Sequence, residues 1–357
     1  MKYGVRSGEM TALLAGVLAA QWFSSTAAGF VDACGNAVFL AILPAGLALA
    51  GLAAVSCALA PERGLLTVCA VQKGMKPFAL VAAALFLLLA ATALRDALSM
   101  LSLTLLPKTP RWCALLYMLP VLVVIGFLGT ASVSRAVKLL APVFLGLYLL
   151  VLVLSVWNQF NVYNFFPILG GGPAAIGKTA LSALSAGAWL PMLWIDRAQL
   201  RRPVRAGVRA CLWATGICTV GYLFYALLFP NGSATDISYP LHRLSVAGGL
   251  SYAFQRAQSL FVFVWLPLLL SASGAGLSYA VRCAQAVLPV RRAWVLVCVG
   301  AAGIALLGLQ DIDVSPAWVR VLLQTNVQAG LLLTLLVPMI AGRVQERRLR
   351  REARQDA

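Results

Sequence analysis

Apolar stretches of membrane-spanning length recur along almost the whole chain. A helix needs about 20 predominantly apolar residues to cross the hydrocarbon core of a bilayer. Six stretches reach or approach that length: Phe78–Leu94, Cys113–Thr130, Leu139–Val156, Leu212–Phe229, Ser259–Ala280 and Val321–Ile340. Four weaker stretches complete the pattern: Met10–Phe30, Ala37–Leu59, Thr179–Ile195 and Ala293–Leu309. The pattern predicts an all-α integral membrane protein with ten transmembrane helices in one domain, residues 1–342, and a tail at 343–357.

Two of the predicted spans carry small and polar residues near their middle. The first contains Ser24 and Ser25, and the sixth contains Ser185 and Gly187 ahead of Pro191. Glycine and proline weaken a helix, and a bilayer tolerates such a break only beside protein or a water-filled cavity. Paired interruptions five spans apart are typical of transporters built from two inverted repeats, which hold their substrate at the breaks. Close helix packing is the alternative reason for small residues in a membrane helix.

The eighth span combines Pro267 with Ser271 and Ser273 in WLPLLLSASGAG. A kink followed by hydroxyl groups could present polar atoms to a cavity, and helix packing is an equal alternative.

Composition and charge placement support a membrane location. The chain is 61% hydrophobic and 11% charged, with a net charge of +17, whereas soluble domains carry about 25% charged residues. With ten spans and a cytoplasmic N-terminus, 21 of the 28 Lys and Arg residues fall on the inner side and 6 on the outer side. This is the positive-inside distribution. We therefore expect both termini in the cytoplasm and no nucleic-acid partner, with the basic tail either touching anionic lipid headgroups or solvated.

The sequence offers no constellation for catalysis or metal binding. Its eight cysteines form no C-x-x-C pair and lie mostly inside apolar stretches, which is the pattern of small buried hydrophobes. A single histidine, His242, cannot form a metal cluster. We expect no enzymatic activity, no metal and no cofactor.

Residues 172–179, GPAAIGKT, match the phosphate-binding loop of nucleotide triphosphatases. A true loop of this kind follows a buried strand, opens a helix and works beside a magnesium-binding Asp. Here the preceding segment is irregular, the following helix enters the membrane, and the predicted topology places the motif outside the cell. We interpret the match as coincidence, with residues 170–172 forming a turn before the sixth span, and expect no ATP binding.

The third span carries two charged residues, Arg95 and Asp96. Charges inside a membrane are costly and are functional candidates by default. Because successive helical residues diverge by about 100°, we predict that these two side chains do not pair and that each has another partner. Arg95 could extend toward the outer interface. We favour a functional role for Arg95 and a structural one for Asp96.

Three stretches carry a family likeness. The first is LRDALSMLSLTLLPKTP, from Leu94 to Pro110; the second runs from GTASVSRAVKLLAPV, which holds Arg135, to NVYNFFPILGGG. The third, from Tyr239 to Trp265, is YPLHRLSVAGGLSYAFQRAQSLFVFVW. Through these motifs, and over nearly its whole length, the chain resembles the spore germination permease family, the B subunit of germinant receptors within the amino acid/polyamine/organocation superfamily.

The resemblance implies a LeuT-like fold of two inverted five-helix repeats, at about 9–157 and 179–342. It also implies a pocket for a small germinant, usually an amino acid, between spans one, three, six and eight, with receptor A and C subunits as partners in the inner spore membrane or bacterial cytoplasmic membrane. Carried over by position, the ligand-binding residues are Gln21, Trp22, Ser24, Ser25, Leu89, Ser185, Ala186, Gly187, Ser271 and Ala272. The structural or gating residues are Arg95, Asp96, Arg135, Arg256 and Trp265.

Two departures from the family pattern affect the pocket. The first span reads AAQWFSS in place of a Gly-x-Gly-like break followed by proline, and the sixth reads GAWLP in place of Gly-x-Glu. An amino group would lose a counter-charge, and Trp22 would reduce the cavity. Three hypotheses follow: a ligand-sensing receptor subunit, a secondary amino acid transporter with Asp96 as the nearest proton-carrying candidate, and a scaffold whose pocket is degenerate.

Overall fold

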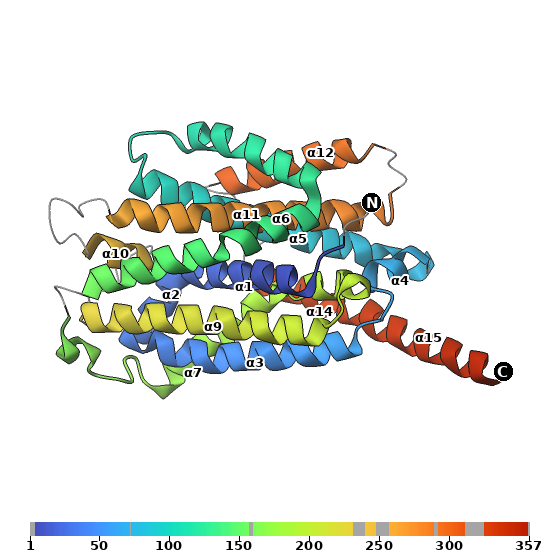
Figure 1. Cartoon of the computed structure of the whole chain (residues 1–357), viewed down its shortest axis with the longest axis horizontal. Helices are drawn as coiled ribbons and strands as arrows, with labels where there is room; N and C mark the ends of the chain where they lie inside the picture. Colours follow the sequence, from blue (N-terminus) through green and yellow to red (C-terminus); the bar gives the residue numbers. More distant parts are fainter. Residues whose placement is uncertain are drawn as a thin grey trace.

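The computed structural model describes residues 4–71, 73–156, 160–230, 240–247, 257–288, 292–310 and 325–355. Within these ranges the regular structure is helical, and the long helices run side by side along one common direction (Figure 1). The first half contains α1 (Ser7–Phe23), α2 (Ser25–Cys34), α3 (Val38–Leu59), α4 (Leu65–Val71), α5 (Lys76–Thr104) and α6 (Arg111–Val156). The second half contains α7 (Pro173–Ala183), α8 (Pro191–Ile195), α9 (Pro203–Leu228), α10 (Pro240–Ala247), α11 (Ala257–Gln285), α12 (Ala293–Leu309), α14 (Thr325–Thr334) and α15 (Leu336–Gln355).

Six helical segments of the described chain are long and apolar enough to cross a membrane. They are Gly29–Leu59, Lys76–Thr104, Arg111–Val156, Pro203–Leu228, Leu260–Gln285 and Gln328–Glu346, with Ala293–Leu309 as a shorter apolar helix. Large apolar side chains such as Leu139 and Tyr117 face outward, 77% and 78% exposed, which suits a lipid surface. The prediction of an all-α membrane protein is confirmed. The first and sixth predicted spans are missing from this set because each is interrupted.

Helix α6 contains two of the predicted spans, joined at Gly129. The backbone of Gly129 has φ 76°, ψ 172°, inside an otherwise helical run of 46 residues. That positive φ is a conformation that glycine adopts at little cost, and Figure 1 shows the chain reversing direction within α6.

Glycines bring neighbouring helices into close contact at the centre of the bundle. A Cβ atom on Gly46 of α3 would lie 1.8 Å from the Thr215 hydroxyl oxygen on α9. On α11, a Cβ atom on Gly274 would lie 2.2 Å from Ile125 of α6, and one on Gly276 would lie 2.9 Å from the Phe86 carbonyl of α5. These two glycines of the eighth predicted span therefore serve helix packing, the second of the two alternatives for that span.

The GPAAIGKT motif forms the start of α7, and the turn that precedes it packs against the end of α2. The segment before it contains a 3-10 turn, η3 (Val162–Phe165), and α7 begins at Pro173. Gly170 has φ 47°, and a Cβ atom there would lie 2.0 Å from the Cys34 carbonyl oxygen, while the Gly171 N–H donates to that same oxygen at 3.2 Å. The Thr179 hydroxyl accepts a hydrogen bond from the Cys34 thiol at 2.9 Å. The glycines and the threonine thus hold α2 in place, in agreement with a coincidental motif match.

All eight cysteines are free, and six of them are buried. Outside the membrane-length helices, burial raises the pKa of the Cys69 thiol on α4 to about 11. These cysteines act as small hydrophobes, as predicted, and the exception is Cys298, which is exposed on α12.

Candidate functional site

The first interruption lies at Ser24, between α1 and α2. Ser24 has φ −93° and ψ −132°, which ends α1 and lets α2 begin at Ser25. The Ser24 side chain is buried, and its hydroxyl donates to the Gln21 carbonyl oxygen at 3.3 Å. The predicted break is therefore present at the predicted residue. The side chain of Ser25 lies outside the described residues.

The second interruption lies between α7 and α8. The α-helix ends at Ala183, tightens into a 3-10 helix, η4 (Leu184–Trp189), and resumes as α8 at Pro191. Ala186 and Gly187 are buried and Ser185 is half-buried. A Cβ atom on Gly187 would lie 2.9 Å from Leu49, so this glycine lets η4 approach α3.

A tryptophan joins the two interruptions. The Trp22 indole N–H, at the end of α1, donates to the carbonyl oxygen of Ala183, the last residue of α7, at 2.9 Å. The carbonyl oxygen of Trp22 in turn accepts from the Tyr222 hydroxyl of α9 at 2.7 Å. Trp22 is 1% exposed. Side-chain donors therefore occupy a backbone acceptor at each break, where buried backbone groups need partners.

An aromatic cluster surrounds the end of α1. The Phe23 ring centroid lies 5.0 Å from that of Trp265 on α11, 5.7 Å from Tyr222 and 6.0 Å from Tyr148 on α6. Trp265 also stacks on Phe261 at 5.7 Å with an interplanar angle of 12°. Trp265, predicted as a structural or gating residue, thus contacts the first break directly. Arg256, from the same motif, lies outside the described residues.

The remaining predicted ligand residues belong to α5 and α11, which pack against each other. Leu89 and Ala272 are both 1% exposed, and Ser271 is half-buried. One turn from Leu89, the Phe86 ring lies 6.3 Å from Trp189 of η4 and 5.1 Å from Tyr279 of α11. Phe86 thereby brings segments three, six and eight into contact. Leu89, Ser271, Ala272 and the residues of η4 do not belong to the lining of the cavities described below.

A buried ionic network, which we call the Asp196 network, follows α8. Asp196 is fully buried; its Oδ1 lies 2.6 Å from Nη2 of Arg282, and its Oδ2 accepts a hydrogen bond from the Tyr279 hydroxyl. Arg282 Nη1 also donates to the Thr130 hydroxyl at 3.2 Å. Sequence reasoning missed this network. Its available signal was a carboxylate directly after the sixth span, with Tyr279 and Arg282 three residues apart on the eighth.

Arg95 and Asp96 correct one prediction. Their side chains form an ion pair, with Arg95 Nη2 and Asp96 Oδ1 3.6 Å apart, although we predicted that adjacent residues could not pair. Arg95 is 8% exposed, so it does not extend to the interface. The separation of about 100° between successive residues applies to the directions of their Cβ atoms. The long arginine side chain bends around the helix and reaches a buried carboxylate that has lost its water.

Arg135 joins α6 to the start of α1. Its Nε lies 3.7 Å from Oε1 of Glu9, and Oε2 of Glu9 accepts from the Arg6 backbone N–H at 3.0 Å. Glu9 is 6% exposed, and sequence reasoning did not select it. Arg135 therefore ties α6 to the first turn of α1.

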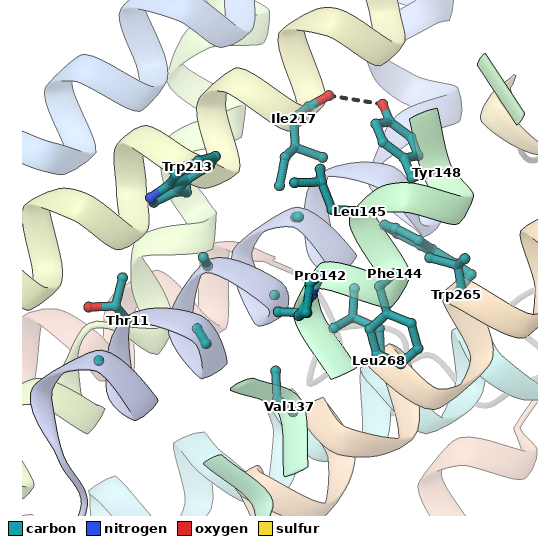
Figure 2. A pocket seen from close by; sticks show the side chains of 17 residues that line it. Thr11, Val137, Pro142, Phe144, Leu145, Tyr148, Trp213, Ile217, Trp265 and Leu268 are labelled. Carbon is teal, nitrogen blue, oxygen red and sulfur yellow. Dashed lines mark hydrogen bonds between the residues drawn. The ribbon is translucent and has the colours of Figure 1, made fainter. Parts of the chain in front are cut away.

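A cavity of about 290 Å³ lies along α1 ahead of the first break, between α1, α6, α9 and α11 (Figure 2). Its lining is apolar apart from a few groups such as Thr11 at one end and Trp265 at the other, and the Tyr148 hydroxyl in its wall donates to the Ile217 carbonyl oxygen at 2.9 Å. No sequence pattern pointed to this cavity.

Comparison with known proteins identifies the family and the fold. Residues 74–313 match the spore germination protein family. No sequence among curated proteins matches the chain. Among solved structures, the manganese transporter of Eremococcus coleocola, in complex with an aromatic bis-isothiourea substituted compound, is similar over 95% of this chain and 75% of its own, with a TM-score of 0.55 and 17% identity. Mhp1, a nucleobase-cation-symport-1 family transporter in a closed conformation with bromovinylhydantoin bound, covers 93% of this chain and 76% of its own at a TM-score of 0.49 and 14% identity.

The family match extends over more than half of the residues, and the transporter similarity covers nearly all of them. The chain is therefore a membrane protein with a LeuT-like transporter fold, and it belongs to the spore germination protein family.

Proposed function

We propose that this chain is the transporter-like membrane subunit of a spore germinant receptor. It binds a small germinant, an amino acid, between the segments that hold α1, α5, η4 and α11, and passes the change to partner A and C subunits. The family and the transporter-like fold support this assignment. The proposed location is the inner spore membrane.

The same proposal includes ten spans, two inverted repeats and cytoplasmic termini. The reversal at Gly129 accounts for two spans within α6, and the interrupted segments α1–α2 and α7–η4–α8 supply the first and sixth. The described chain begins and ends at the same side of the bundle (Figure 1). The loops with Arg63 and Arg202 lie near the chain ends, because the Arg63 N–H donates to Glu346 of α15 and the Arg202 N–H donates to Ser7 of α1. This arrangement supports basic loops and both termini on one side, as the positive-inside rule expects.

The hydrogen bond from Trp22 to Ala183 carries the proposal. At the two breaks, the carbonyl oxygen of Ala183 accepts from the Trp22 indole N–H, and that of Trp22 accepts from the Tyr222 hydroxyl. A ligand that replaces these donors must itself donate hydrogen bonds, and an ammonium group offers three. Backbone carbonyls and the negative end of α7 would stabilise that ammonium group in place of the glutamate that the family's sixth span often carries.

Displacement of Trp22 then supplies the switch. In the described state the indole holds α1 to α7, and the aromatic cluster of Phe23, Tyr222 and Trp265 packs around the same point. A ligand that takes over the Ala183 carbonyl favours a second state in which the indole has moved away. Ligand affinity must differ between the two states for this shift to occur.

Replacement of Trp22 by phenylalanine tests the proposal. Trp22→Phe removes the competing N–H, so the lone pair of the Ala183 carbonyl oxygen that the indole occupies becomes open to a ligand. A buried hydrogen bond is worth about 1 kcal/mol, so amino acid affinity should rise about fivefold. The measurement is a titration of the purified protein with each amino acid, read by thermal stability.

Trp194→Phe is the matched control, because Trp194 of α8 is also buried and its indole N–H makes no hydrogen bond within the described structure. It should leave the affinity unchanged. Wild-type and Trp22→Phe proteins that bind no amino acid would refute the sensing proposal. Equal gains in the two variants would refute the role of the Trp22 hydrogen bond.

Secondary transport is the second candidate, and the similarity to a manganese transporter favours it. Counterflow of amino acids in proteoliposomes separates the two functions. Saturable uptake that Asp96→Asn abolishes would establish transport, whereas binding without flux would establish sensing.

A further inference from the structure

An arginine-lined cavity lies where the N-terminal ends of α1 and α9 meet. Its volume is about 370 Å³. Four arginines line it, together with small residues of both helices: Arg201, Arg202, Arg205, Arg209, Ser7, Gly8, Thr11 and Ala206. The two helix ends are tied together, because the Arg202 backbone N–H donates to the Ser7 hydroxyl at 3.3 Å.

The four arginines have no carboxylate partner among the described residues. Within the described part of the chain, none of their guanidinium groups forms an ion pair. Glu9, the acidic residue of α1, is already held by Arg135 and by the Arg6 backbone. The positive ends of two helix dipoles add to the field. The four arginines are exposed residues, so this concentration of positive charge is accessible to an anion at the basic face of the protein.

The arginine cavity adjoins the apolar cavity of Figure 2. Gly8 and Thr11 line both. Along α1 the apolar cavity runs past small residues to Ala19, and the helix rises by about 16 Å between Gly8 and Ala19. That length is about half of a 30 Å hydrocarbon core, the depth of one leaflet.

The apolar cavity is shaped by small residues on one side and large ones on the other. One side of its lining consists of small residues of α1, namely Ala12, Ala15 and Gly16. Leu145 of α6 and Trp213 of α9 face the cavity from the opposite side (Figure 2). Trp213 is 57% exposed, so the cavity opens at the lipid-facing side of the bundle.

We propose that these two cavities together bind one anionic phospholipid. The phosphate group lies among the four arginines, whose planar guanidinium groups bind phosphate through paired hydrogen bonds. One acyl chain lies along α1 in the apolar cavity. The bound lipid fills the space between α1, α6 and α9, and it stabilises α1 against its neighbours.

Lipid addition to the delipidated protein tests this site. Purified protein in detergent is titrated with phosphatidylglycerol, with phosphatidylcholine of the same acyl chains, and with inorganic phosphate. Bound lipid is counted by native mass spectrometry, and the thermal midpoint is recorded. Phosphatidylglycerol should bind at a one-to-one ratio and raise the midpoint, whereas the other two probes should not. Phosphate acting as strongly as phosphatidylglycerol would indicate a free-anion site, and phosphatidylcholine acting as strongly would indicate a nonspecific lipid surface; either result overturns the proposal.

Charge variants locate the headgroup. R201Q/R202Q/R205Q/R209Q should weaken phosphatidylglycerol binding by at least about tenfold, because each basic residue adds to the attraction of an anionic headgroup. R347Q/R348Q/R350Q/R351Q makes the same change of charge in the tail and should bind as wild type does. Equal losses in both variants would contradict a specific site.

A cavity variant locates the acyl chain and does not depend on the folding of the arginine variant. Ala12→Phe fills the apolar cavity beside Thr11 without altering charge. It should weaken binding of long-chain phosphatidylglycerol and leave binding of the dihexanoyl form unchanged. Unchanged binding of the long-chain lipid would place the chain elsewhere and refute the proposal.

Discussion

Breaking the Asp196 network should reveal a strong, non-additive contribution to stability. Asp196 is fully buried, and its partner Arg282 has a side chain that is 29% exposed. Removing one member of a buried ion pair costs about 3–5 kcal/mol, because the remaining charge loses its compensation. Arg282→Gln leaves the Asp196 carboxylate with the Tyr279 hydroxyl, so we expect the lower end, about 3 kcal/mol.

The reciprocal change should cost less. Asp196→Asn removes the buried charge itself, and the partly exposed Arg282 can reach water, so we expect about 1–2 kcal/mol, the cost of a weakened buried hydrogen bond. The double variant carries no buried charge and should be no less stable than Arg282→Gln alone. The resulting coupling energy is about 1–2 kcal/mol, within the range for residues in direct contact.

Equilibrium unfolding of the purified protein in mixed micelles gives the four free energies of this cycle. Arg343→Gln is the control, because it removes an arginine of similar exposure whose partners are Glu62, 45% exposed, and Glu346, 12% exposed. Neither carboxylate is fully buried, and exposed pairs contribute at most about 1 kcal/mol. Additivity within 0.5 kcal/mol, or a loss from Arg282→Gln no greater than that from Arg343→Gln, would refute the reasoning.

Two further predictions concern the turn before α7 and the topology. Gly170→Ala should destabilise the protein by about 2 kcal/mol or more, since its φ of 47° and the Cys34 carbonyl 2.0 Å from a Cβ atom both oppose a side chain. Gly172 has a φ of 91° but open space around it, so thermal unfolding should show that Gly172→Ala lowers the stability by only about 1 kcal/mol. Equal losses of stability in the two variants would contradict a steric clash at Gly170. A cysteine at Lys178 should react with a membrane-impermeant thiol reagent added outside intact cells, and one at Arg63 only after the membrane is opened, in a background without native cysteines; the reverse pattern would invert the topology.

The sequence predicted the helices and the first break because both depend on local patterns. Apolar stretches of span length appear as helices, and the serines at Ser24 and Ser25 mark the junction of α1 and α2. An interruption of the sixth segment was also predicted, but the local structure of that interruption was not. A 3-10 helix between Ala183 and Pro191 depends on the approach of η4 to α3, which no local pattern specifies.

The contacts at the candidate site could not be predicted, because they join residues far apart in the chain. Trp22 reaches Ala183 across 161 residues, and Asp196 meets Arg282 across 86. The failure at Arg95 and Asp96 has a different cause. Helical geometry fixes the direction of Cβ atoms, while burial determines where a long charged side chain bends to find a partner.

Site-specific labelling by a germinant analogue shows directly whether the germinant binds at the two helix breaks. A photoreactive amino acid is bound to the purified protein, activated by light, and its attachment sites are mapped by mass spectrometry. We expect saturable labelling in residues 21–25 and 183–190. The unlabelled amino acid should prevent this labelling, and Trp22→Phe should strengthen it. Saturable labelling confined to other segments, or labelling that Trp22→Phe leaves unchanged, would contradict a germinant site at the two helix breaks.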